Sequence, residues 1–140
     1  MLFQRISRKG PERIFGIFQK VDAAAMVDGE VAVLNVTATP TVPGGEVKKA
    51  TSLSQTNVVG VVSGAIAIGD YGLIQVYGNH PNVKMTTAAL AAGSVVYSNT
   101  AAAAEVNAGA IARADMGTLL GVTTVVGASN RANVFIKCMG

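Results

Sequence analysis

The sequence is poor in the residues that carry most enzyme chemistry. Its 140 residues include one cysteine, one histidine and no tryptophan. The lone Cys138 excludes an internal disulfide, and a metal site on His80 would need further His, Cys or clustered carboxylates nearby, which the sequence lacks. We therefore expect His80 to be a polar surface residue of a turn and Cys138 to be a buried, unreactive thiol.

Charged residues are also few. They make up 14% of the chain, against 50% hydrophobic residues, and the net charge is +3. This composition fits a protein that covers much of its surface with partners; a compact core rich in Ala and Gly is the alternative. No run of about 18 apolar residues occurs, so we expect no membrane span. Charges stand where a signal peptide needs its apolar segment, so we expect no export by that route.

Catalytic patterns are missing as well. The carboxylates are scattered, and Asp28 and Glu30 flank Gly29 in what reads as a turn, not an acid/base pair. The sequence has no phosphate-binding loop of the Gly-x-x-x-x-Gly-Lys type. The one Cys/His combination places its thiol in an apolar strand, where it is a poor nucleophile. We therefore expect a protein that is not an enzyme and that binds no cofactor or metal.

What the chain does have is short β-branched runs closed by glycines. Residues 57–64 and 73–78 are two such runs, joined by turn chemistry at Gly69-Asp70, and they predict antiparallel neighbouring strands. Further strands are expected over residues 14–21, 31–36, 83–86, 95–98, 101–106, 122–126 and 132–138. Residues 37–49 are expected to form an exposed loop and residues 78–82 a tight turn, with Gly78 at a strand end. The apolar residues of the first strand are expected in the core.

These strands predict a mainly β fold, a small antiparallel β-sandwich or barrel-like domain over residues 14–140. Landmarks recur in its two halves. Residues 119–122 echo residues 58–61, and residues 88–97 resemble residues 24–33. Residues 23–78 and 88–140 are therefore either two copies of one β unit or chance echoes in a chain rich in Gly, Val and Ala.

Residues 1–13 form the most basic part of the chain. They hold Arg5, Arg8, Lys9 and Arg13 against a single acid, and Gly10-Pro11 breaks any helix. We expect an extended arm. It could lie on a partner through charge pairs and added strand hydrogen bonds, fray as a solvated tail, or bind nucleic acid. Because the remaining chain is nearly neutral, we favour the first reading, with these four residues as partner contacts, and rank a nucleic-acid-binding protein last among the alternatives.

The glycine and hydrophobic spacing over residues 58–138 resembles that of small structural proteins of tailed bacteriophages, above all capsid decoration, or cement, proteins. The stretches that carry the resemblance are Gly69-Asp70-Tyr71-Gly72-Leu73-Ile74-Gln75-Val76-Tyr77-Gly78, Gly93-Ser94-Val95-Val96-Tyr97-Ser98, Gly117-Thr118-Leu119-Leu120-Gly121-Val122 and Asn133-Val134-Phe135-Ile136.

This resemblance implies a virion protein, made in the bacterial host cytoplasm, that sits on the capsid exterior and clamps neighbouring major capsid proteins. It also implies a homo-oligomer, often a trimer. Another virion component, such as a head-fibre base or a tail-associated β protein, is the alternative that the sequence leaves open.

Overall fold

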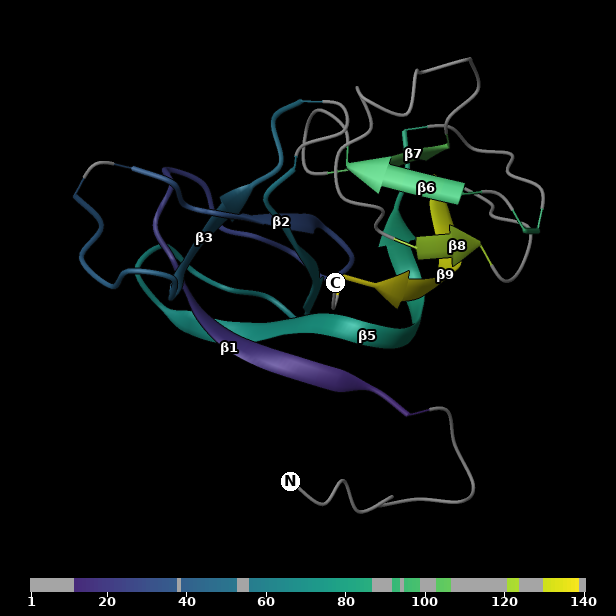
Figure 1. The fold of residues 1–140 in the computed structure, drawn as a ribbon, viewed down its shortest axis with the longest axis horizontal. Helices are drawn as coiled ribbons and strands as arrows, with labels where there is room; N and C mark the ends of the chain where they lie inside the picture. Colours follow the sequence, from purple (N-terminus) through teal and green to yellow (C-terminus); the bar gives the residue numbers. More distant parts are fainter. Residues whose placement is uncertain are drawn as a thin grey trace.

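The computed structural model describes residues 12–37, 39–52, 56–86, 92–93, 95–98, 103–106, 121–123 and 130–138. In this part the protein is all β, which confirms the expected fold class (Figure 1). The strands are β1 (Ile14–Lys20), β2 (Val31–Leu34), β3 (Glu46–Lys49), β4 (Val58–Ser63), β5 (Tyr71–Lys84), β6 (Val95–Ser98), β7 (Ala104–Val106), β8 (Gly121–Thr123) and β9 (Arg131–Lys137). None of the described residues forms a helix that could cross a membrane.

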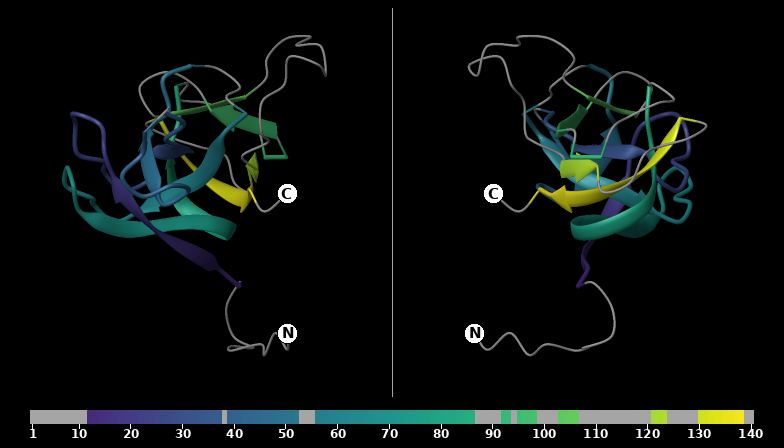
Figure 2. Two further views of the ribbon diagram at one scale, coloured as in Figure 1. Left: turned by 60° about the vertical axis from the view of Figure 1, so that its left-hand side comes forward. Right: turned by 90° about the vertical axis from the view of Figure 1, so that its right-hand side faces the viewer.

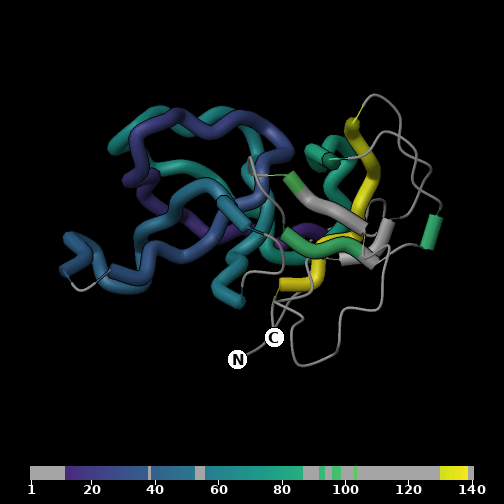
Figure 3. The backbone as a smooth tube through the Cα atoms, turned by 90° about the horizontal axis from the view of Figure 1, so that it is seen from above, coloured from purple at the N-terminus to yellow at the C-terminus, as the bar shows by residue number. Residues whose placement is uncertain are grey.

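One sheet of nine strands contains them all, in the order β1-β3-β2-β4-β5-β9-β8-β6-β7. Because β1 also pairs with β5, the strands β1, β3, β2, β4 and β5 close into a ring. Every pairing is antiparallel except the short parallel one between β1 and β3. Seen from above, the ring lies on one side and the green and yellow strands on the other (Figure 3). The first half of the domain is therefore a small barrel.

Strand β5 joins the two halves because it is 14 residues long. Its first part pairs with β1 and β4, and its second part pairs with β9. The tight turn expected over residues 78–82 and the return strand over residues 83–86 are therefore wrong. The chain continues as one curved strand, and a register shift between His80 and Val83 absorbs Pro81, which cannot donate to a ladder (Figure 1).

Two cores follow from the alternation of side chains along the strands. The first fills the ring, since every ring strand contributes to it: Phe18, Ala32, Val47, Val62 and Ile74, with Met26 and Ile66. The second packs the outer wall of the barrel against β5, β6 and β9, and includes Val31, Val33, Val61, Val83, Val96, Val134 and Ile136. Strand β2 supplies both cores, which is why all three of its valine and alanine side chains are fully buried.

The two halves repeat one pairing pattern. Strand β2 pairs with β3 and β4, and β4 pairs with β5; likewise β6 pairs with β7 and β8, and β8 pairs with β9. The register agrees as well. Ala32 lies opposite Gly60 in the first half, and Val96 lies opposite Gly121 in the second. A duplicated β unit requires such a pattern, and the duplication itself stays a prediction.

Candidate partner-binding surface

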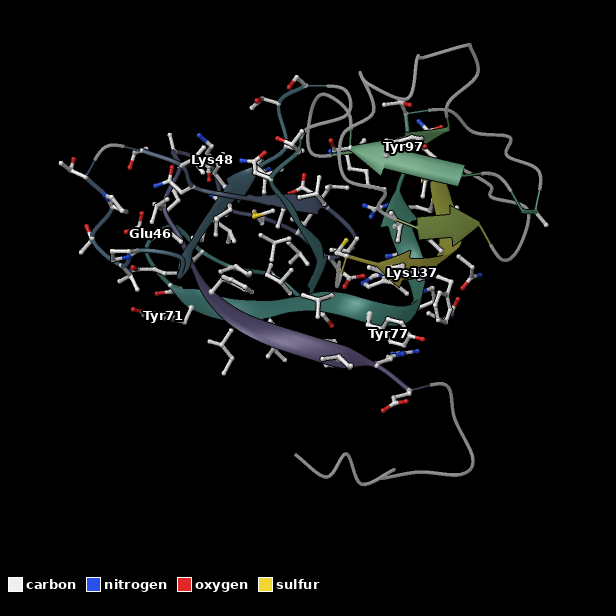
Figure 4. All side chains as sticks on the ribbon, viewed as in Figure 1. Glu46, Lys48, Tyr71, Tyr77, Tyr97 and Lys137 are labelled. Carbon is white, nitrogen blue, oxygen red and sulfur yellow. The ribbon has the colours of Figure 1, made fainter. Side chains whose placement is uncertain are left out.

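The outer side of β1 and β5 carries four exposed apolar side chains. Their exposed fractions are 39% for Phe15, 70% for Ile17, 61% for Tyr71 and 45% for Leu73. The two strands are antiparallel neighbours with Ile17 opposite Leu73, so these two side chains are cross-strand neighbours, and Phe15 and Tyr71 follow on the same side of their strands. We call this group the β1–β5 apolar face. Strand β1 lies on the outside of the molecule along β5 in each ribbon view, with Tyr71 at one end of β5 (Figures 2 and 4).

The expected role of β1 as a core strand is wrong for half of its apolar residues. Phe18 packs against the core of the ring, but Phe15 and Ile17 alternate with it and point outward. The sequence did hold a signal for this face. Ile14, Phe15, Ile17 and Phe18 put apolar side chains on both sides of one strand, which requires either two buried sides or an exposed patch.

The turn that precedes β5 extends this face. Ile68 is exposed, and the neighbouring Gly69 donates a backbone hydrogen bond to the Lys20 carbonyl oxygen at 2.8 Å. The Gln19 side-chain amide in turn donates to the Gly69 carbonyl oxygen at 3.0 Å. These bonds hold the turn against the end of β1, so the apolar surface continues beyond the paired strands.

Of the four predicted partner contacts, only Arg13 lies among the described residues. It is exposed and directly precedes β1, whereas Arg5, Arg8 and Lys9 lie outside the described part of the chain. The backbone at Glu12 passes so close to Gly78 that a Cβ there would lie 2.1 Å from the Glu12 carbonyl oxygen. Gly78 also has a φ of 97°, as a glycine turn position predicts. It lies inside β5, however, and not at a strand end.

His80 is buried, with 3% of its surface exposed, so the prediction of a surface turn residue is wrong. Its Nδ1 accepts the Asn82 backbone N–H at 3.2 Å, which leaves the proton on Nε2 to be donated to the Val62 carbonyl oxygen, also at 3.2 Å. Burial lowers the pKa of His80 more than the nearby Asp28 carboxylate raises it. A neutral imidazole with both nitrogens hydrogen-bonded serves as a structural link between strands.

Asp28 links its turn to the residues around His80 through hydrogen bonds. Its carboxylate accepts hydrogen bonds from the Gly64 backbone N–H at 2.9 Å and from the Asn82 side chain at 3.0 Å. The Arg131 guanidinium donates to the carbonyl oxygens of Asp28, at 2.8 Å, and of Asn82, at 3.2 Å. Burial raises the pKa of Asp28, but the hydrogen bonds from Gly64 and Asn82, together with the positive charge of Arg131, lower it by more. The carboxylate is therefore ionised, and each of its oxygens already accepts a hydrogen bond.

A second polar cluster lies around Glu30, which is almost fully buried. Its carboxylate contacts the ammonium groups of Lys49, at 3.0 Å, and Lys84, at 3.2 Å, and accepts the Val27 backbone N–H at 3.0 Å. Burial raises the pKa of Glu30, but the Val27 N–H and the two lysines lower it by more. The cluster joins the residue that precedes β2 to β3 and β5 through charge pairs in which Glu30 is buried and the two lysines are partly exposed.

The loop expected over residues 37–49 is shorter than predicted, because Glu46–Lys49 form β3. Glu46 is buried and holds the loop in place. Its Oε1 accepts the Val42 backbone N–H at 2.8 Å, and its Oε2 accepts the Asn35 side-chain amide at 2.7 Å. Lys49 of the same strand pairs with Glu30, which lies 19 positions away, and a local reading of the sequence misses that contact.

The described residues hold no group of three or more His, Cys, Asp or Glu side chains that could bind a metal ion. Burial raises the pKa of the Cys138 thiol to about 12, which agrees with the unreactive cysteine expected from the sequence. The surface feature that calls for an explanation is therefore the β1–β5 apolar face.

The chain matches no protein-family model, and no curated protein is significantly similar to it. Its function must therefore be sought in the surface geometry and in the spacing of its glycines and apolar residues.

Proposed function

We propose that this protein is a structural protein of a tailed-phage virion. It decorates the capsid exterior and binds the major capsid protein through the β1–β5 apolar face and the basic arm that precedes it. The observation that carries the proposal is this face, four exposed apolar side chains on two paired strands, directly after a segment rich in arginine. Contiguous apolar patches of this kind mark interaction surfaces, whereas single exposed apolar residues are ordinary.

The energetics suit a protein that acts in many copies. Burying one large apolar side chain fully contributes about 1.5–3 kcal/mol, so the half-exposed residues of this face supply a few kcal/mol for each copy. That is modest for one contact. A shell, however, presents many equivalent sites, and a protein that binds the assembled lattice but not free subunits stabilises the assembly by mass action. Oligomerisation, as in the trimers of the proteins it resembles, would strengthen the attachment of each copy.

A binding experiment with purified capsid shells that lack this protein tests the proposal. The wild-type chain should cosediment with the shells. The double variant Ile17→Ser with Leu73→Ser should bind at least about tenfold more weakly, a loss of about 1.4 kcal/mol or more, while its melting temperature stays close to that of the wild type.

The matched control is Val36→Ser, because Val36 is 65% exposed but follows β2 and belongs to neither β1 nor β5. This variant should bind like the wild type. A wild-type chain that does not bind shells would overturn the proposed function. If the protein is instead found on the tail, or in a fibre present at a few sites per particle, its copy number will show that it is another virion component.

A further inference from the structure

Among the described residues, strand β1 has one edge that pairs with a neighbour only at its C-terminal end. On one side it pairs with β5 along its whole length, from Ile14 to Gln19. On the other side it meets β3 only at Gln19 and Lys20. Within the described residues no strand lies beside the segment from Ile14 to Phe18 on that side. The barrel is therefore closed at one end of β1 and open at the other.

The direction of the backbone groups at this edge follows from the hydrogen bonds at its closed end. Lys20 donates its N–H to the Asp70 carbonyl oxygen, on the β5 side, whereas Gln19 donates to Gly45 on the β3 side. Successive residues of a strand point their backbone groups to opposite edges. The N–H and C=O groups of Phe15 and Ile17 therefore point toward the open edge, the same two residues whose side chains form half of the apolar face.

The residues that would otherwise cover this edge are held away from it. In the parallel register of β1 and β3, the chain just before Glu46 would run beside Phe15 and Ile17. Instead, the Gly45 N–H donates to the Val42 carbonyl oxygen at 3.0 Å, and the buried Glu46 carboxylate binds the Val42 N–H. These bonds fold residues 42–45 into a turn, so β3 does not extend along the edge.

The charges at the open end of β1 are mainly positive. Arg13 directly precedes the strand. Burial is the main cause that lowers the pKa of His80, and the positive charges of Arg13 and Arg131 lower it further, so both guanidinium groups lie near His80. Lys137 pairs with Tyr77, which also pairs with Ile14 at the start of β1 (Figure 4). The acids there are Glu12 and the already hydrogen-bonded Asp28. Arg5, Arg8 and Lys9 precede this end in the sequence.

We infer that the open edge of β1 receives an extended, acidic segment of the capsid protein as an added strand. This inference rests on the proposed function and names the chemistry of its partner. Backbone groups of Phe15 and Ile17 supply the hydrogen bonds, their side chains cover the apolar residues of the incoming strand, and the basic end of β1 attracts its carboxylates. Strand addition of this kind gives affinity through the main chain and selectivity through alternate side chains.

Matched pairs of variants separate the edge from the face. Phe15→Ala and Phe15→Pro both remove the aromatic ring, but only the proline removes the N–H at the open edge, where the β5 ladder does not need it. Ile17→Ala and Ile17→Pro form a second pair. We expect each proline variant to bind shells at least about tenfold more weakly than its alanine counterpart, with a similar melting temperature. Equal binding within both pairs would overturn the added strand while leaving the proposed function intact.

Hydrogen exchange on the unmodified protein gives a second measurement that does not depend on a variant folding. In the free protein the amides of Phe15 and Ile17 should exchange rapidly, while those of Gly16 and Phe18, which bond to β5, exchange slowly. On shells the Phe15 and Ile17 amides should slow at least about tenfold. Unchanged exchange at these two amides in a bound sample would contradict the inference.

The acidic character of the segment is tested by salt. Binding of the wild type should weaken as sodium chloride rises from about 50 to about 500 mM, because screening shortens the reach of surface charges to a few ångströms. The variant Arg13→Gln should show a shallower dependence. A wild-type affinity that salt does not change would rule out an acidic segment, and absence of wild-type binding at any salt concentration would overturn the proposed function instead.

Discussion

Gly78 decides how β1 begins. The residue combines a φ of 97° with a close approach of the Glu12 backbone, so a side chain here meets two independent penalties. Gly78 itself lies inside the continuous strand β5, where the backbone cannot move without loss of ladder hydrogen bonds. The position of Glu12 and Arg13, just before β1, depends on the absence of a Cβ at this one position.

We predict that Gly78→Ala costs about 3 kcal/mol of folding free energy, from backbone strain together with the overlap with Glu12. Gly64→Ala is the control, because Gly64 also has a positive φ, of 93°, but nothing lies within 4 Å of its Cβ position. That variant should lose only the strain, about 1 kcal/mol. Urea unfolding measures both, and equal losses would show that the contact with Glu12 does not matter.

His80 makes stability depend on pH above the range in which carboxylates titrate. Burial lowers its pKa in the folded protein below the ordinary value of 6.5. As pH falls below 6.5 the unfolded chain binds a proton that the folded chain does not, so stability decreases. The pKa values of Asp28 and Glu30 lie below their ordinary values of 3.8 and 4.5, so their contributions are lost only at lower pH.

We therefore predict that the melting temperature of the wild type falls between pH 7 and pH 5. The variant His80→Gln should be less stable at pH 7, because the ring bridges the Val62 carbonyl and the Asn82 N–H. Its melting temperature should nevertheless change little over the same interval. Scanning calorimetry at several pH values makes the comparison, and a parallel decline in both proteins would assign the pH dependence to another group.

At the scale of elements, the sequence predicts those strands whose signals are local. The pair β4 and β5, the turn at Gly69 and the closing strand β9 follow from β-branched runs and glycines alone. The same local chemistry fails at residues 78–82. Gly, Asn and Pro there have the composition of a turn, but pairing with β9 across a bulge keeps the chain extended. Long-range pairing outweighs local propensity in a sheet.

The local sequence does not predict strand β3, for a related reason. Glu46, Lys48 and Lys49 look like a solvated loop, and burial of Glu46 becomes acceptable only through the Asn35 amide and the Val42 N–H. The candidate surface was likewise only half predictable. The charge of Arg13 predicts a partner contact. The exposure of Phe15 and Ile17, in contrast, follows from the lack of further described strands packed against β1, and the local sequence of β1 does not predict which strands will pack against it.

In the sequence of the whole molecule a basic segment directly precedes the first strand of the apolar face, and we expect the two to act together. We predict that deleting residues 1–11 leaves the melting temperature nearly unchanged, because the deletion spares Glu12, Arg13 and every described strand. Attachment to capsid shells should weaken at least about tenfold, through loss of Arg5, Arg8 and Lys9. The comparison is cosedimentation of both chains under one salt condition. A truncated chain that binds as tightly as the full one would exclude the arm as a partner contact.

The pairing of β1 with β5 also bears on how the chain is made. Gln19 bonds to Gly69, 50 positions further along, so at a translation rate of about 5–20 residues per second the first strand waits roughly 3–10 seconds for its neighbour. The barrel can then close before β6 to β9 have all left the ribosome. Until they emerge, the outer wall of β2 and β4 stays bare, and this interval is when a nascent chain most needs protection from its neighbours on the polysome.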